Sequence, residues 1–136
     1  MKYKILEHTA DIMFEVYGKT LNELFKNSAI AVIDVMVDRR SINVKKKKEV
    51  VLENDSVEDL LLSFLEEIVY IKDADYMIFK NVKVNVRGSV LKAVLEGDSI
   101  KHGKQKLKTD VKAVTLHKFY LKKVKEGYQA GFILDL

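Results

Sequence analysis

Residues 20–37 have the sequence TLNELFKNSAIAVIDVMV and constrain the architecture more than any other part of the chain. Thr20 and Glu23 form the Thr-x-x-Glu pattern of a capping box, which predicts that a helix starts here. At about 100° per residue, the apolar positions leave only a narrow polar seam near Asn27 and Asp34. A helix that is apolar on most sides must be covered on most sides. These apolar positions are Leu21, Leu24, Phe25, Ala29, Ile30, Ala31, Val32, Ile33, Val35 and Met36.

A second helix of the same character is predicted to start at Ser56, which precedes Val57, Glu58 and Asp59. Its stripe is also broad, since Leu62 and Ile71 widen a face that is already apolar over several turns. That face consists of Val57, Leu60, Leu61, Phe64, Leu65, Ile68 and Val69.

The other apolar segments are short and strand-like, and in 12–17 the residues Ile12, Phe14 and Val16 alternate inward. A short hairpin is expected around Lys45–Lys48. Two broad helices and about eight strands predict an α+β fold, a three-layer sandwich with the helices packed between β layers. One sheet with both helices on a single face is the simpler alternative, and the stripe widths favour the sandwich. The expected strands are 3–6, 12–17, 42–44, 49–52, 77–79, 82–87, 91–96, 112–123 and 128–134.

Size and composition predict one folded domain over residues 1–136. Hydrophobic residues make up 48% of the chain and charged residues 32%, which is typical of folded soluble proteins and not of disordered ones. The absence of cysteine excludes disulfides, zinc-thiolate sites and thiol catalysis. No apolar run is long enough to span a bilayer and the N-terminus lacks a signal-peptide pattern, so we expect a cytoplasmic protein with no membrane partner. The net charge of +4 is compatible with an anionic partner without requiring one.

Two aspartates stand beside strand-like apolar residues at opposite ends of the chain. Asp11 precedes the strand at 12–17, and Asp135 lies one residue before Leu136. Clustered carboxylate oxygens are what a hard cation such as calcium or magnesium binds. The simpler interpretations are a strand-entry acid for Asp11 and a solvated terminal residue for Asp135. Spacing alone does not bring the two together.

Several blocks of the chain resemble the archease family, in the same order and over essentially its whole length. The first is Tyr3-Lys4-Ile5-Leu6-Glu7-His8-Thr9-Ala10-Asp11-Ile12. The others are Tyr17-Gly18-Lys19-Thr20-Leu21, Phe25-Lys26-Asn27-Ser28-Ala29, Leu60 to Tyr70, Val111-Lys112-Ala113-Val114-Thr115-Leu116-His117 and Ile133-Leu134-Asp135-Leu136.

The resemblance implies a three-layer fold with helices between β layers. It also implies a function: archeases are accessory proteins of the GTP-dependent tRNA-splicing RNA ligase, which joins a 3′-phosphate or cyclic phosphate end to a 5′-hydroxyl end. They promote guanylylation of the ligase and allow multiple turnover, and they do not join RNA themselves. tRNA and GTP are therefore partners only through the ligase, and we expect no catalytic residue in this chain.

The family's metal site carries over to Asp11, which ends His-Thr-Ala-Asp, and to Asp135 in the terminal Ile-Leu-Asp-Leu. Leu136 adds oxygen from the C-terminal main chain. Oxygen ligands without sulfur suit calcium, with magnesium or manganese as substitutes. His8, Lys112 and His117 are candidates for supporting the site or contacting the ligase, with local packing and hydrogen bonding as the alternative for His8.

The remaining polar residues have simpler interpretations. His117 is expected to be an interior strand histidine, and His102 an exposed loop residue. Lys45–Lys48 is most simply a solvated hairpin tip. The basic stretch 101–108 is either a solvated loop or a contact for RNA, and it lacks the interleaved aromatic residues of single-strand RNA binders. Arg87-Gly88-Ser89 is predicted to be a hairpin turn.

Two other classes of function remain open at this point. A metal-dependent hydrolase needs carboxylates that organise a cation and an attacking water, although the chain shows no dedicated nucleophile or general base. A general chaperone or RNA-binding adaptor would act without the ligase, and an adaptor would bind RNA with strong salt dependence.

Overall fold

The structure is a computed structural model that describes residues 3–8 and 11–136. These residues form two α-helices, one short 3-10 helix and seven strands. In chain order the elements are β1 (Tyr3–His8), β2 (Asp11–Gly18), α1 (Leu21–Met36), η1 (Arg39–Ser41), β3 (Lys46–Glu53), α2 (Val57–Asp75), β4 (Met77–Arg87), β5 (Val90–Ser99), β6 (Ala113–Val124) and β7 (Gly127–Asp135).

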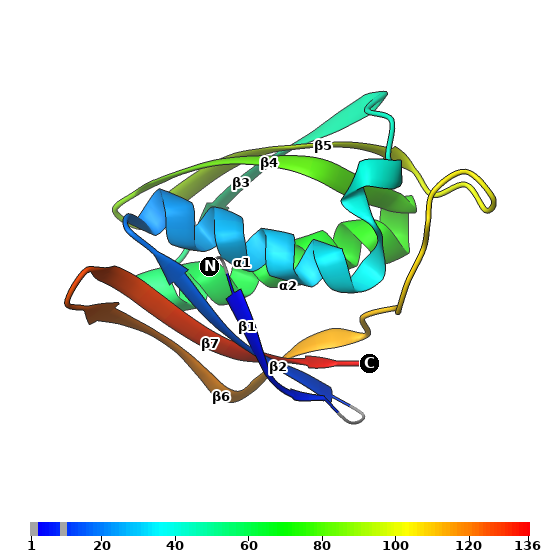
Figure 1. The fold of residues 1–136 in the computed structure, drawn as a ribbon. Helices are drawn as coiled ribbons and strands as arrows, with labels where there is room; N and C mark the ends of the chain where they lie inside the picture. Colours follow the sequence, from blue (N-terminus) through cyan, green and yellow to red (C-terminus); the bar gives the residue numbers. More distant parts are fainter. Residues whose placement is uncertain (1–2, 9–10) are drawn as a thin grey trace.

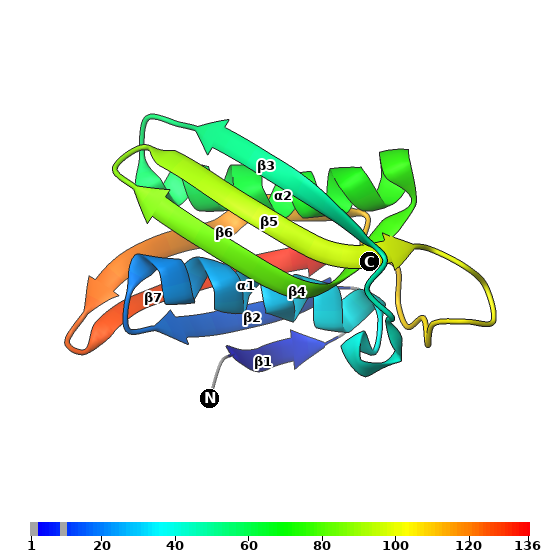
Figure 2. The ribbon, with the colours of Figure 1, turned by 90° about the horizontal axis from the view of Figure 1, so that it is seen from above.

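The strands form two antiparallel sheets that enclose the helices. One sheet has the order β1-β2-β7-β6 and the other β3-β5-β4. Both helices lie between them, with α1 packed on β2 and β7 of the first sheet and on β4 of the second (Figures 1 and 2). This arrangement confirms the predicted α+β sandwich and excludes the single-sheet alternative.

Helix α1 is the centre of the core, as its broad apolar surface predicted. Thr20 is its N-cap, and the Thr20 side chain accepts a hydrogen bond from the backbone N–H of Glu23 at 3.1 Å. Even the polar seam is used. Asn27 is buried and donates to the carbonyl of Tyr17 at 2.8 Å, which ties the helix to the end of β2. Asp34, the other seam residue, accepts hydrogen bonds from the side chains of Tyr3 and Arg39, so the polar seam is satisfied, whereas the buried hydroxyl of Ser28 has no hydrogen-bond partner among the described residues.

Helix α2 packs beside α1 in the middle layer. Ser56 caps it by accepting from the backbone N–H of Asp59 at 3.1 Å, as expected. Val57 is only half-buried, whereas the rest of the predicted apolar face is buried, and Ile71 joins it. The buried apolar residues are Leu60, Leu61, Phe64, Leu65, Ile68, Val69 and Ile71.

The predicted hairpin around Lys45–Lys48 is wrong. Three of these lysines lie inside β3, whose pairing with β5 begins at Lys46 opposite Gly97, and residues 42–44 are not a strand. Burial along β3 alternates with a period of two, so that Lys48, Val50 and Leu52 are more buried than their neighbours. Since β3 is an edge strand, its lysines are placed where they discourage pairing with another chain.

The expected strands 77–79 and 82–87 are one strand, β4. A register shift between Phe79 and Asn81 marks an irregularity that interrupts the alternation, and pairing with β5 continues on both sides of it. The predicted turn at Arg87-Gly88-Ser89 is confirmed, with Gly88 at a φ of 58°.

The loop between β5 and β6 crosses the C-terminal end of α1. The backbone N–H groups of Lys108 and Thr109 donate to the carbonyls of Met36 and Val35 at 2.8 and 3.0 Å. These are carbonyls that a helix end leaves without intrahelical partners. The loop therefore completes α1 and leads the chain back to the first sheet.

Neither helix of the described residues is long and apolar enough to cross a membrane.

Candidate cation site

The fold brings the two distant aspartates together. Strands β2 and β7 are antiparallel neighbours (Figure 1), and their register places Asp11 directly opposite Asp135. Residues directly opposite in an antiparallel pair have Cβ atoms about 4.5–5.5 Å apart and point to the same face. The pairing of β2 with β7 therefore brings the two chain ends together, as the metal hypothesis requires.

The register is set by the core. Ile12 and Leu134 are paired and buried, and Phe14 pairs with Phe132 in the same way. Their rings have centroids 5.6 Å apart. A slip of one residue would move these side chains into solvent, so the pairing is strongly specified. With the even positions inward, Asp11 and Asp135 face outward, where the first is exposed and the second half-buried.

A third strand flanks the pair. Ala113 of β6 lies opposite Asp135 on the other side of β7, and the backbone N–H of Lys112 donates to the Asp135 carbonyl at 2.8 Å. Lys112, expected to support the site, is thereby placed next to it, and its side chain is exposed. Leu136 is half-buried and packs against the core. The terminal residue is therefore held at the sheet, which keeps its main-chain oxygens near Asp135.

Lys72, which no sequence pattern singled out, anchors the approach to this strand. Its ammonium group contacts Asp110, lies 2.8 Å from Asp73 and donates to the carbonyl of Val111 at 2.7 Å. Burial lowers the pKa of Lys72, but the hydrogen bonds to the two carboxylates outweigh it and raise the pKa above its ordinary value. The anchor fixes the backbone immediately before Lys112. The sequence feature that could have pointed to this anchor is a lysine on the apolar side of α2.

The chemistry of the site is that of clustered oxygen anions. Within the described part of the chain, neither Asp11 nor Asp135 forms a salt bridge, and no three His, Cys, Asp or Glu residues gather as a metal-binding group. Like charges directly opposite each other destabilise a sheet, and a hard divalent cation would compensate them. Two carboxylates and main-chain oxygen without sulfur fit such a cation.

The histidines do not share one role. His117 is exposed and lies in the register break of β6 between Thr115 and Tyr120, so the expected interior position is wrong. The alternation that suggested it ends at this break, where Lys118 has a φ of 57°. His117 is four residues from Ala113, about 13 Å of extended strand, and is not brought to the acidic pair.

His8 pairs with Ile12 through the backbone, and its side chain lies outside the described residues, as do Thr9 and Ala10. His102 is exposed in the loop, as expected.

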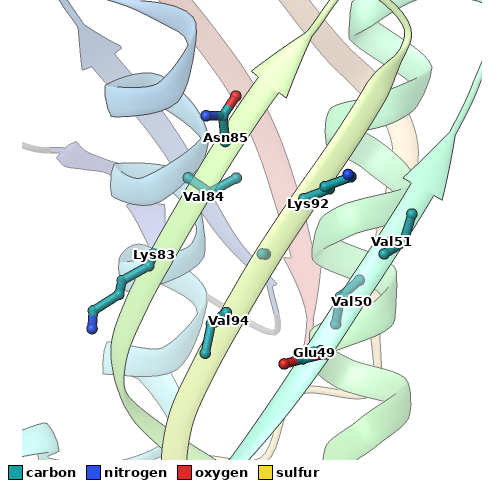
Figure 3. A pocket seen from close by; sticks show the side chains of 9 residues that line it. Glu49, Val50, Val51, Lys83, Val84, Asn85, Lys92 and Val94 are labelled. Atoms are coloured by element: carbon teal, nitrogen blue, oxygen red, sulfur yellow. The ribbon is translucent and has the colours of Figure 1, made fainter.

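A separate groove of 380 Å³ crosses the sheet of β3, β5 and β4. Figure 3 shows side chains of all three strands along it, with charged residues beside valines. Glu49, Lys83 and Lys92 supply the charges, and Val51 is 67% exposed. This sheet is on the other side of the helices from β2 and β7, so the groove is distinct from the acidic pair.

The fold and the paired acids define an α+β sandwich protein with a candidate cation site at one end of its larger sheet. The sequence model of the archease protein family matches residues 3–136. The chain therefore belongs to the archease family. Among curated relatives, protein archease of Archaeoglobus fulgidus is 39% identical over 145 residues, covering 100% of both chains. Protein archease of Thermococcus kodakarensis is 38% identical and covers 99% of both.

Solved structures agree on the fold. The solution structure of protein 1598 of Methanobacterium thermoautotrophicum is 29% identical, with a TM-score of 0.81 and coverage of 99% of both chains. A crystal structure of an archease from Thermotoga maritima, named a possible chaperone, is 19% identical with a TM-score of 0.69, and covers 98% of this chain and 96% of its own. At that identity the second likeness supports the fold alone.

Proposed function

We propose that this protein is a cytoplasmic accessory protein that activates the GTP-dependent tRNA-splicing RNA ligase. It promotes guanylylation of the ligase and supports multiple turnover in joining 3′-phosphate and 5′-hydroxyl RNA ends, and it catalyses no step itself. tRNA and GTP are bound by the ligase. Membership of the archease family supports this role, and the pairing of Asp11 with Asp135 is the observation that carries it.

In this proposal Asp11, Asp135 and the main-chain oxygens of Leu136 hold a divalent cation, calcium foremost, with magnesium or manganese as substitutes. When bound, the cation supplies positive charge toward the anionic groups of the ligase and its substrates. The protein's own contribution is positioning. The buried Ile12–Leu134 pair keeps the two carboxylates opposite each other. The Lys72 anchor holds the strand beside them.

The first experiment uses a substoichiometric amount of the cognate ligase with RNA ends that it can join. Adding this protein is expected to raise the yield from about one product per ligase to many, and to raise the fraction of guanylylated ligase. Yield that stays at one turnover with and without the protein would sink the proposal. RNA or nucleotide hydrolysis by this protein alone would favour a metal-dependent hydrolase instead.

The second experiment tests the site. Asp135→Asn replaces the carboxylate by a neutral amide of the same shape. The variant is therefore expected to fold and to lose stimulation of the ligase. Asp55→Asn is the matched control, because Asp55 is exposed and precedes α2 at a distance in sequence from both aspartates. Full stimulation by Asp135→Asn would remove the cation site from the mechanism.

A chaperone is the second candidate function, favoured by one observation. Val51 is largely exposed within the 380 Å³ groove over β3, β5 and β4, and an exposed apolar position of this kind can receive an apolar segment of a client. This function predicts that the wild type suppresses the aggregation of an unrelated protein. Val51→Lys is expected to abolish that suppression and to leave ligase stimulation unchanged.

A further inference from the structure

Tyr76 has an unusual backbone conformation and an exposed ring. It follows α2 with φ of 52° and ψ of 47°, the left-handed region that glycine or asparagine normally occupies after a helix. A tyrosine in this conformation is strained. Burial does not compensate the strain, because Tyr76 is 68% exposed. The stability of this chain alone therefore gives no reason for a tyrosine at position 76.

The fold places Tyr76 at the start of the basic loop that follows β5. Its carbonyl accepts a hydrogen bond from the backbone N–H of Ile100 at 2.7 Å, and the next residue, Met77, pairs with Ser99. Lys101 comes directly after these contacts. Figure 1 shows the end of α2, the start of β3 and this loop at the same end of the molecule.

Lysines of β3 lie at the same end of the molecule as Tyr76. The ammonium group of Lys48 lies 3.1 Å from the carboxylate of Asp75, the residue before Tyr76. The ammonium group of Lys46 donates to the hydroxyl of Ser99 at 2.7 Å. Tyr76 thus has lysines from β3 and from the loop around it, although the two sets are far apart in the sequence.

The loop is held in a defined shape. Gln105 is buried, and its amide group donates to the carbonyl of Ser99 at 3.0 Å while its oxygen accepts from the backbone N–H of Lys101 at 2.8 Å. The backbone N–H of Lys104 donates to the carbonyl of Lys101 at 3.1 Å, which closes a turn. Lys101 and Lys104 are therefore presented by an ordered turn.

Positive charge is in excess at this end. Lys48 and Lys101 pair with Asp75 and Asp98. The other lysines of β3 and of the turn at 101–104, which are Lys46, Lys47 and Lys104, are exposed and form no salt bridge with a described residue, and the same holds for Lys45 directly before β3. A group of uncompensated lysines attracts a polyanion.

We propose that the surface formed by Tyr76, Lys46, Lys101 and Lys104 binds single-stranded nucleic acid. The lysines contact phosphates, and the exposed Tyr76 ring stacks on an unpaired base. Single strands fit better than duplexes because their bases are free to stack on a side chain. No aromatic residue lies among the loop lysines in the sequence, and the fold supplies one from the end of α2. This binding goes beyond activation of the ligase and does not require it.

The test measures fluorescence anisotropy of a labelled oligouridylate of about 12 nucleotides, a length within known single-strand site sizes, with the isolated protein at about 50 mM salt. Tyr76→Gly is expected to weaken binding by about 5- to 150-fold, the range that base stacking supports, and to melt at the same or a higher temperature because glycine relieves the backbone strain. Tyr76→Phe keeps the ring and is expected to bind like the wild type.

Tyr70→Ala is the matched control, since Tyr70 is a 63% exposed tyrosine of α2; its binding is expected to be unchanged. Lys46→Ala and Lys104→Ala are each expected to reduce the slope of log affinity against log salt by about 0.7. Three results would overturn the proposal: no binding by the wild type, equal binding of Tyr76→Gly, or preference for a duplex of the same length. Loss of ligase stimulation by Tyr76→Gly with unchanged oligonucleotide binding would identify a protein contact instead.

Discussion

The pairing of Asp11 with Asp135 predicts that one substitution has opposite effects without and with calcium. The register places the two Cβ atoms about 5 Å apart. At that separation two unit charges repel each other by about 0.8 kcal/mol at the dielectric constant of water and by about 3 kcal/mol at an effective value of 20. Because Asp11 is exposed and Asp135 half-buried, we expect about 1 kcal/mol.

Asp11→Asn removes this repulsion and preserves the side-chain shape. In a chelating buffer the variant is expected to be more stable than the wild type by about 1 kcal/mol, or about 3–5 °C in Tm. With calcium at about 100 times its Kd, the wild type gains about 2.7 kcal/mol. The variant lacks one of the charged ligands and is expected to gain much less. The order of stability therefore reverses when calcium is added.

The assay is thermal and urea unfolding followed by circular dichroism, in chelator and over a calcium titration, with magnesium and manganese as parallel series. Asp55→Asn is the control for loss of a surface charge and is expected to keep the wild-type response to calcium. Two results would refute the reasoning. One is an Asp11→Asn variant that is less stable than the wild type in chelator, and the other is a wild-type Tm that none of the three ions raises.

Three further predictions concern the scaffold. Lys72→Met keeps the buried stem and removes the ammonium group that holds the backbone at 110–111, so amide hydrogen exchange at Lys112 is expected to accelerate while global stability changes little. Burial and the hydrogen bond to Asp34 raise the pKa of Tyr3 from 10.0 to about 12. Its neutral form therefore stabilises the fold below pH 10, and this contribution is lost as the pH rises toward 12, so the stability difference between wild type and Tyr3→Phe is expected to shrink across that interval in urea unfolding. Gly97→Ala would place a Cβ 1.9 Å from a backbone carbonyl of β4, and we expect a loss of about 3 kcal/mol or more in the free energy of unfolding.

Local sequence patterns were sufficient for the helices. The caps at Thr20 and Ser56 and the broad apolar stripes depend on residues within a few positions of each other, and the structure confirms both. The stripe of α1 also predicted the layers, because a helix apolar on most sides has to be enclosed. The composition of a short segment thus determined its burial and, through burial, the class of fold.

In two strands, tertiary pairing overrides the structure that the local alternation predicts. The lysines of β3 are indistinguishable from a solvated turn until β5 pairs with them. His117 continues the apparent alternation of its strand, but the register break after Thr115 places it in solvent. Irregularities of this kind arise from the fit of one strand to its neighbour, and nothing in the strand's own sequence specifies them.

The sequence by itself determined the core residues, the helix ends, the layered architecture and the oxygen chemistry available near the two chain ends. Only the tertiary structure decided that Asp11 lies opposite Asp135 and that Tyr76 stands among lysines of β3 and the following loop. The physical reason is the range of the interactions. Caps and stripes join neighbours along the chain, whereas both sites join distant segments whose positions are set by sheet register and by packing around α1.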